Sequence, residues 1–133
     1  MWAHQYQNKK AFIQSLGADC TNWLWSWSYV NHAERFVLFG AWDDMITPRG
    51  QLILRDAWQA GKSGRTAGYG QSRRHVDLVL NDGYDLFTFR MRRGLRDPSD
   101  PGGPSKILDF EERIVRKNLV RAGDDWIAED LDP

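Results

Sequence analysis

The sequence predicts an α+β domain built on a strongly curved, barrel-like mixed β-sheet with two or three flanking helices. Aromatic and β-branched residues alternate with polar residues in several short segments, which is the period of half-buried strands. Two other segments carry apolar residues at helical spacing between a capping residue and a stop signal. The resulting order of helix, hairpin, strand, helix and several further strands suits such a curved sheet.

Length and composition indicate one domain with its own core, because the chain has 133 residues. Acidic and basic side chains balance at 18 each, so the overall charge indicates no class of partner. Cys20 is the one cysteine, which excludes an internal disulfide and favours a reducing, cytoplasmic compartment. No apolar run approaches the ~20 residues of a membrane span, and no signal peptide begins the chain. The closing Glu-Asp-Leu-Asp-Pro resembles the start of a linker, which favours a domain of a longer protein.

The charges are unevenly distributed along the chain. Residues 1–61 carry five Lys/Arg and five Asp/Glu, residues 62–96 carry eight against three, and residues 97–133 carry five against ten. A basic segment within a neutral domain indicates one basic face.

An aromatic segment, residues 22–43, holds four of the seven tryptophans. Trp23, Trp25, Trp27 and Tyr29 recur with a period of two, so a strand would place their rings on one face. Residues 31–34 resemble a turn and residues 35–41 a returning strand, which predicts a β-hairpin.

The other elements are predicted from caps, periods and turn residues. A helix capped by Asn8 should run through Leu16 and stop at Gly17. A third strand is expected over 51–58, a glycine-rich basic loop over 61–70, and a short helix from a Ser72 cap to 81–83. The remaining predictions are a strand over 84–91, a loop over 92–105, strands over 107–110 and 113–120 (or a helix over 109–121), a turn at 122–125 and a strand at 126–128.

The aromatic segment also suggests a site for a flat group. Same-face rings in a strand lie roughly 6.5–7 Å apart, which leaves room for one base or methylated group between them. A packed core is the usual role of such residues, so both interpretations stay open. The candidate walls are Trp42, Trp23 and Trp25, with Asn22 and Asp43 as groups that would read the edge of a base; Trp27, Trp58 and Trp126 are assigned to the core.

A second group of candidates would hold a nucleic-acid backbone. The expected helix start at residues 71–74 would offer free N–H groups and a dipole that favour an anion, and basic residues flank it. A basic patch beside an aromatic cluster is the combination that binds phosphates and stacks a base. The predicted backbone contacts are Lys62, Arg65, Tyr69, Gln71, Ser72, Arg73, Arg74, Arg90, Arg92 and Arg93.

Catalytic patterns are weak by comparison. The Gly61-Lys62-Ser63 run lacks the glycine that a phosphate-binding P-loop needs five residues earlier, where Asp56 stands. Adjacent acids at 43–44 and 124–125 are typical of solvated turns, and one cysteine with scattered histidines gives no zinc spacing. We therefore expect no catalytic residue, metal or cofactor. The alternatives are a small hydrolase that uses Asp43, Asp44 and a histidine, or a protein-interaction module with an exposed tryptophan patch.

The runs Asn-Trp-Leu-Trp-Ser-Trp, Phe-Val-Leu-Phe-Gly-Ala-Trp-Asp, Gly-Tyr-Gly-Gln-Ser and Gly-Tyr-Asp-Leu-Phe-Thr-Phe resemble the N-terminal domains of HNH-type, modification-dependent restriction endonucleases. The similarity extends from about residue 9 to 130 and includes the closing Leu-Val-Arg-Ala-Gly-Asp-Asp-Trp-Ile-Ala. Domains with this task, of the SRA, EVE and YTH types, commonly have a PUA-like barrel and flip a modified base into an aromatic pocket. The resemblance thus implies a reader of double-stranded DNA with 6-methyladenine or 5-methylcytosine. The HNH motif itself is missing, so cleavage would belong to another part of a longer chain.

Overall fold

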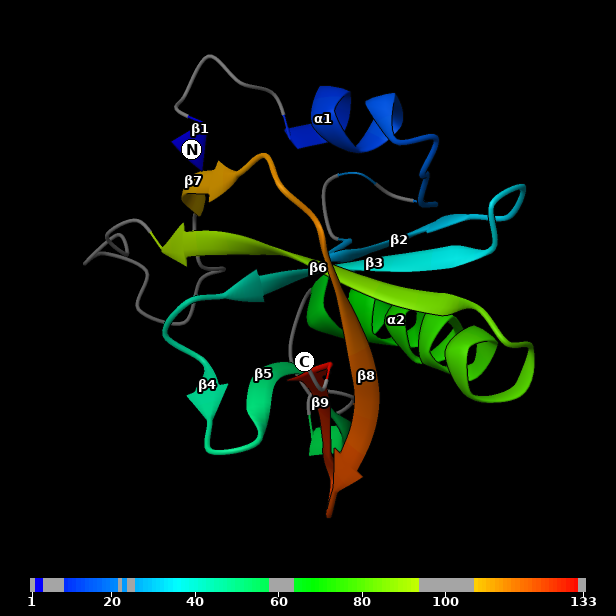
Figure 1. Cartoon of the computed structure of the whole chain (residues 1–133), viewed down its shortest axis with the longest axis vertical. Helices are drawn as coiled ribbons and strands as arrows, with labels where there is room; N and C mark the ends of the chain where they lie inside the picture. The colour runs from blue at the N-terminus through cyan, green and yellow to red at the C-terminus, as the bar shows by residue number, and fades with distance from the viewer. Residues whose placement is uncertain are drawn as a thin grey trace.

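The computed structural model describes residues 2–3, 9–21, 23, 26–57, 64–93 and 107–131 (Figure 1). In chain order these residues form β1 (Trp2–Ala3), α1 (Lys9–Ser15), β2 (Ser28–Asn31), β3 (Phe36–Trp42), β4 (Ile46–Thr47), β5 (Gly50–Arg55), α2 (Gly64–Asn81), β6 (Asp85–Arg93), β7 (Ile107–Glu111), β8 (Val115–Ala122) and β9 (Asp125–Asp130). The described chain is therefore α+β, with two helices and one mixed sheet, as expected.

The described strands belong to one nine-stranded sheet centred on β6. Along one edge β6 pairs in parallel with β3, which continues to β2 in a hairpin. Along its other edge β6 pairs antiparallel first with β8 and then with β7. The sheet continues from β8 through β9 and β5 to β4, and β1 pairs with β7. The described strands form an open sheet rather than a closed barrel.

The sheet curls strongly around α2. Val37 and Phe39 of β3 share one core with Ile53 of β5, although these strands lie on different branches of the sheet. Trp27 also connects the two branches, since its Nε1 donates to the carbonyl oxygen of Ile53 at 3.2 Å. Val76 of α2 fills the space between the two branches. The strands therefore form a half-barrel that α2 packs into from one side.

The second core lies on the opposite face of β3 and β6. Buried Leu38, Phe89 and Met91 pack there against Ile13 of α1 and Tyr29 of β2. Figure 1 shows α1 and α2 on opposite sides of the central strands. Alternate residues of β3 thus face two different helices, which is why β3 is apolar along its whole length.

The aromatic segment departs from the predicted strand. β2 begins only at Ser28, and Trp23 lies in a turn while Trp27 lies in a bend. The prediction that these two rings share one strand face with Tyr29 is wrong: Trp23 packs against the α1-side core and Trp27 against the α2-side core. The returning strand is confirmed as β3, with the turn one residue later than expected, at 32–35.

The largest correction concerns α2. Residues 64–70 were expected in a loop, and Ser72 as a helix cap, but the helix already begins at Gly64 and places Ser72 in its middle. Its end at Asn81, before the positive φ of Gly83, is as expected. The α1 stop at Gly17 is also confirmed, with φ of 75°, and Asn8 lies outside the described residues.

The C-terminal half follows the predicted strands. β7, β8 and β9 occur as expected, so the alternative helix over 109–121 is excluded. The strand expected over 51–58 is β5, which ends at Arg55. Arg92 and Arg93 belong to β6 rather than to a loop, while residues 94–106 lie outside the described part.

Candidate functional site

The parallel pairing of β3 and β6 brings several candidate residues to one end of the sheet. Trp42, at the end of β3, lies opposite Met91 of β6. The backbone N–H of Asp43 donates to the carbonyl oxygen of Met91 at 2.9 Å, which extends the pairing by one residue. Arg90 and Arg92 flank Met91 and both project to the face of the sheet opposite that of Met91 and Trp42. Two predicted base-pocket residues and two predicted backbone contacts thus meet at the carboxyl ends of neighbouring parallel strands, where α/β proteins commonly bind ligands.

Arg92 is held at this end by an ion pair. Its Nε donates to Oδ1 of Asp109 at 2.6 Å, and its Nη2 donates to Oδ2 of the same carboxylate. The side chain of Asp109 is 2% exposed, whereas that of Arg92 is 40% exposed. Hydrogen bonding to Asp109 raises the pKa of Arg92, with a smaller contribution from the charge of Asp43. A fixed guanidinium therefore lies within electrostatic range of the carboxylate next to Trp42.

Trp42 and Trp23 are both half-buried and pack against the α1-side core. Trp23 stacks on Tyr29 with ring centroids 5.6 Å apart and an interplanar angle of 22°, and the Lys10 ammonium lies 5.5 Å from the Trp23 ring centroid. Trp23 thus already has a stacking partner on one face. Asn22 and Trp25, the other two pocket candidates, lie outside the described residues.

Three of the predicted backbone contacts are buried instead. Gln71 is 4% exposed and Ser72 is fully buried, while Tyr69 is 8% exposed. Gln71 Oε1 accepts from the backbone N–H and the hydroxyl of Thr21, both at 2.7 Å. Gln71 and Ser72 do not lie at a helix N-terminus as expected, because α2 begins at Gly64 and turns these side chains into the interior.

His75 completes the buried polar layer between α2 and β2. The hydroxyl of Ser28 lies 2.7 Å from His75 Nδ1 and 2.6 Å from the hydroxyl of Ser72. Burial, with added repulsion from Arg74 and His32, lowers the pKa of His75 from 6.5 to about 4. The ring is therefore neutral at physiological pH. With both serines fully buried, this triad resembles a packing network rather than an accessible Ser–His nucleophile.

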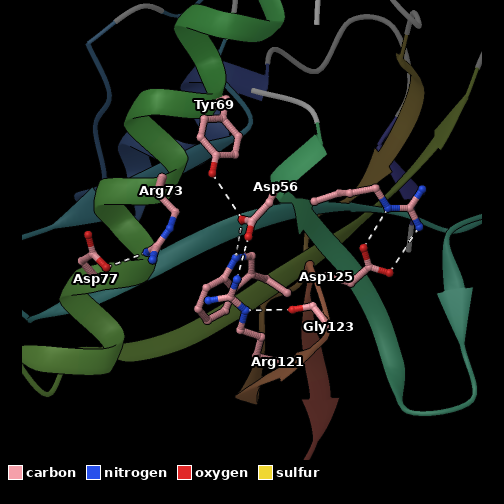
Figure 2. Close-up of polar contacts among 9 residues, drawn as sticks. Asp56, Tyr69, Arg73, Asp77, Arg121, Gly123 and Asp125 are labelled. Atoms are coloured by element: carbon pink, nitrogen blue, oxygen red, sulfur yellow. Dashed lines mark hydrogen bonds and ion pairs between the residues drawn. The ribbon is translucent and has the colours of Figure 1, made fainter. Parts of the chain in front are cut away.

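The core assignments differ among the other tryptophans. Trp126 is 3% exposed, which confirms its core assignment, while Trp27 is half-buried against the same core and Trp58 lies outside the described residues. Asp56 accepts hydrogen bonds from Trp126 Nε1 at 3.0 Å, from Arg121 at 2.7 Å and from the Tyr69 hydroxyl at 3.3 Å (Figure 2). This carboxylate joins the end of β5, α2 and the β8–β9 hairpin.

Arg73 belongs to this structural cluster rather than to a phosphate clamp. Its guanidinium lies 4.8 Å from the Trp126 ring centroid and pairs with Asp77 at 2.6 Å (Figure 2). Arg74, one residue on, is exposed. Lys62 lies outside the described residues, and of Arg65 and Arg93 only the backbone is described, in α2 and β6.

A cavity of about 250 Å³, hereafter the half-barrel cavity, opens on the inner face of the sheet. Of the residues that line it, sequence reasoning had singled out Arg90 alone. The lining comprises Gln51, Thr88, Arg90, Glu111, Arg113, Val115 and Lys117. These residues come from β5, β6, β7, β8 and the turn between the last two. Arg113 and Lys117 were missed because their segment, residues 97–133, is acidic overall.

Within the described residues, no three His, Cys, Asp or Glu side chains are grouped so that they could hold a metal ion. No helix in the described ranges has the length and apolar character needed to cross a membrane. Comparisons with protein-family models, with curated proteins and with solved structures found no match to this chain.

Proposed function

We propose that this chain is the specificity domain of a modification-dependent restriction endonuclease and binds double-stranded DNA that carries 6-methyladenine or 5-methylcytosine. One observation carries the proposal: the parallel β3–β6 pair gathers Trp42, Asp43, Arg90 and Arg92 at a single end of the sheet. These side chains offer a ring for stacking, a carboxylate for an exocyclic N–H, and guanidinium groups for phosphates. The sequence resemblance to modified-DNA readers, which include PUA-like barrels, supports the same function.

Trp42 and Asp43 are the residues proposed to hold the modified base. A base stacked on an aromatic side chain contributes ~1–3 kcal/mol by alanine substitution, and each enclosed methyl group adds ~0.8 kcal/mol. Unmodified DNA need not place a base on the ring. Losing the ring should therefore lower the affinity for modified DNA more than the affinity for unmodified DNA, whether or not the base leaves the double helix.

The test is a binding series on one duplex sequence with no modification, 6-methyladenine, 5-methylcytosine or 5-hydroxymethylcytosine. Trp42→Ala should narrow the preference for the modified duplex about tenfold, which corresponds to ~1.4 kcal/mol. Asp43→Asn should also reduce the preference for the modified duplex, because an amide presents a hydrogen-bond donor where the carboxylate accepted a hydrogen bond from the base.

The matched control is Asp44→Asn, which makes the same change of charge at the next, exposed position and should retain the parent's selectivity. Thermal melts must first confirm that each variant is folded, because Trp42 also packs against a core. Equal loss of selectivity in both aspartate variants would contradict the role of Asp43. Strand cleavage by this chain that both variants abolish would favour the hydrolase alternative.

A further inference from the structure

We infer that the half-barrel cavity is a binding site for a phosphate group, with Arg90, Arg113 and Lys117 as its cationic ligands. The inference deepens the proposed function, because a phosphate of the DNA backbone is one source of such a group; a free nucleotide is the other. The site lies on the inner face of the β6 end, and the opposite face of the same end carries Trp42 and Met91.

Strand register explains why the three cations converge. In the antiparallel β6–β8 pair, Thr88 lies opposite Val115 and Leu86 lies opposite Lys117, so these four side chains share the inner face. Arg90 continues the same alternation along β6. β7 and β8 both follow that edge of β6, and the break between them places residue 113 at the cavity.

The charge balance of the lining favours an anion. Three cations face one acidic side chain, Glu111. Arg113 is exposed and, within the part of the chain that the structure describes, has no ion-pair partner. The Lys117 side chain is only 10% exposed and pairs with Asp130, which is 85% exposed. A mostly buried ammonium with one solvated partner is stabilised further by a second negative charge.

The floor of the cavity adds a neutral donor. The Thr88 hydroxyl donates to Gln51 Oε1 at 2.8 Å, and both residues are buried. This bond leaves the amide nitrogen of Gln51 as the free end of the side chain. No buried side-chain nitrogen or oxygen among the described residues lacks a partner, so this nitrogen is open to the cavity. An amide N–H₂ beside guanidinium and ammonium groups offers hydrogen-bond donors to phosphate oxygens.

The lining argues against a base as the occupant. Its one apolar side chain is Val115, and it contains no aromatic ring on which a base could stack. Donors also outnumber acceptors, since Glu111 is the one carboxylate. The Glu111 carboxylate would repel a phosphate but would accept a hydrogen bond from a base. Whether Glu111 weakens or strengthens binding therefore distinguishes the two ligand classes.

The experiment titrates the whole chain with inorganic phosphate and with deoxynucleoside 5′-monophosphates, followed by amide chemical shifts. The signals of Thr88 and Val115 should move most. Arg113→Gln should weaken binding roughly tenfold, the lower range for a hydrogen bond between charged groups. Glu111→Gln should tighten it about threefold, as expected for removal of a partly exposed like charge.

Arg116→Gln is the matched control. Arg116 lies in β8, three residues after Arg113, and its substitution removes the same charge, but its side chain faces outward and pairs with Asp85 at 2.9 Å. Its variant should bind phosphate as the parent does. Weakening by Glu111→Gln, or equal weakening by Arg113→Gln and Arg116→Gln, would overturn the inference, as would the absence of any shift at the cavity.

Duplex DNA distinguishes the two phosphate sources. If the cavity takes a backbone phosphate, Arg113→Gln should reduce the slope of log affinity against log salt by about 0.9, and the mononucleotide should compete with the duplex. If a free nucleotide is the ligand, its binding should depend on Arg113 while duplex binding does not. Phosphate binding without any duplex binding would refute the proposed function and leave this inference standing.

Discussion

Protonation of His75 should make the stability of this protein depend on pH between about 4 and 6.5. The folded-state pKa is lowered from 6.5 to about 4, chiefly by burial of the ring. In this interval the unfolded chain binds more protons than the folded one, so the free energy of unfolding rises with pH. The stabilisation is complete above pH 6.5 and is lost as the pH falls toward 4.

The magnitude follows from the size of the shift. Each pKa unit corresponds to 1.36 kcal/mol, so the contribution lost between pH 7 and pH 5 is roughly 2 kcal/mol. The assay is urea unfolding followed by tryptophan fluorescence at both pH values, with the parent and His75→Gln. Glutamine is neutral throughout, so the variant should lose roughly 2 kcal/mol less than the parent on acidification.

Comparing pH slopes removes the cost of the substitution itself, because that cost is present at both pH values. Arg74→Gln supplies an internal check: Arg74 is the second cause of the lowered pKa of His75, so its removal should reduce the slope partially. If His75→Gln loses as much stability on acidification as the parent, the reasoning from burial is refuted.

Two further predictions concern stability. Gly50→Ala should lower the free energy of unfolding by about 3 kcal/mol, because φ is 151° and a Cβ would overlap the backbone of the neighbouring strand β9. Gly123→Ala should lower it by only about 1 kcal/mol, because Gly123 has φ of 62° and a Cβ there would meet nothing within 4 Å. Equal urea midpoints for the two variants would contradict this prediction. Asp56→Asn should lower the free energy of unfolding by about 2 kcal/mol, because it weakens a partly buried acceptor that three donors share. Arg121→Gln should lower it by no more than ~1 kcal/mol, because it removes a half-exposed ion pair. A larger loss of stability in Arg121→Gln than in Asp56→Asn would contradict Asp56 as the centre of this cluster.

Much of the fold could be predicted because it depends on local patterns. The positions of β3, β5 and β6, the stop of α1 at Gly17 and the hairpin turn at Gly123 all follow from alternation or from glycine. Each of these signals arises from the backbone geometry of a few neighbouring residues. The aromatic segment does not follow its predicted strand, because its alternation of residues extends beyond β2 while the chain turns at Trp23.

The start of α2 shows where local propensity was overridden. Gly64, Gly68 and Gly70 disfavour a helix and resemble a loop. The helix forms because Tyr69 and Gln71 become buried and gain hydrogen bonds to Asp56 and Thr21, which are distant in sequence, and such packing is absent from any short window of sequence. The buried Gly68 also shows how closely this helix approaches its neighbours.

By itself, the sequence determined the α+β class, most strand positions and the candidate roles of Trp42, Asp43 and Arg90. The tertiary structure alone decided which of these residues are neighbours. Parallel pairing placed Trp42 beside Arg92, and antiparallel pairing brought Arg113 of an acidic segment to Arg90 of a basic one. The physical reason is that charge and shape act through space, whereas composition along the chain averages over residues that face in different directions.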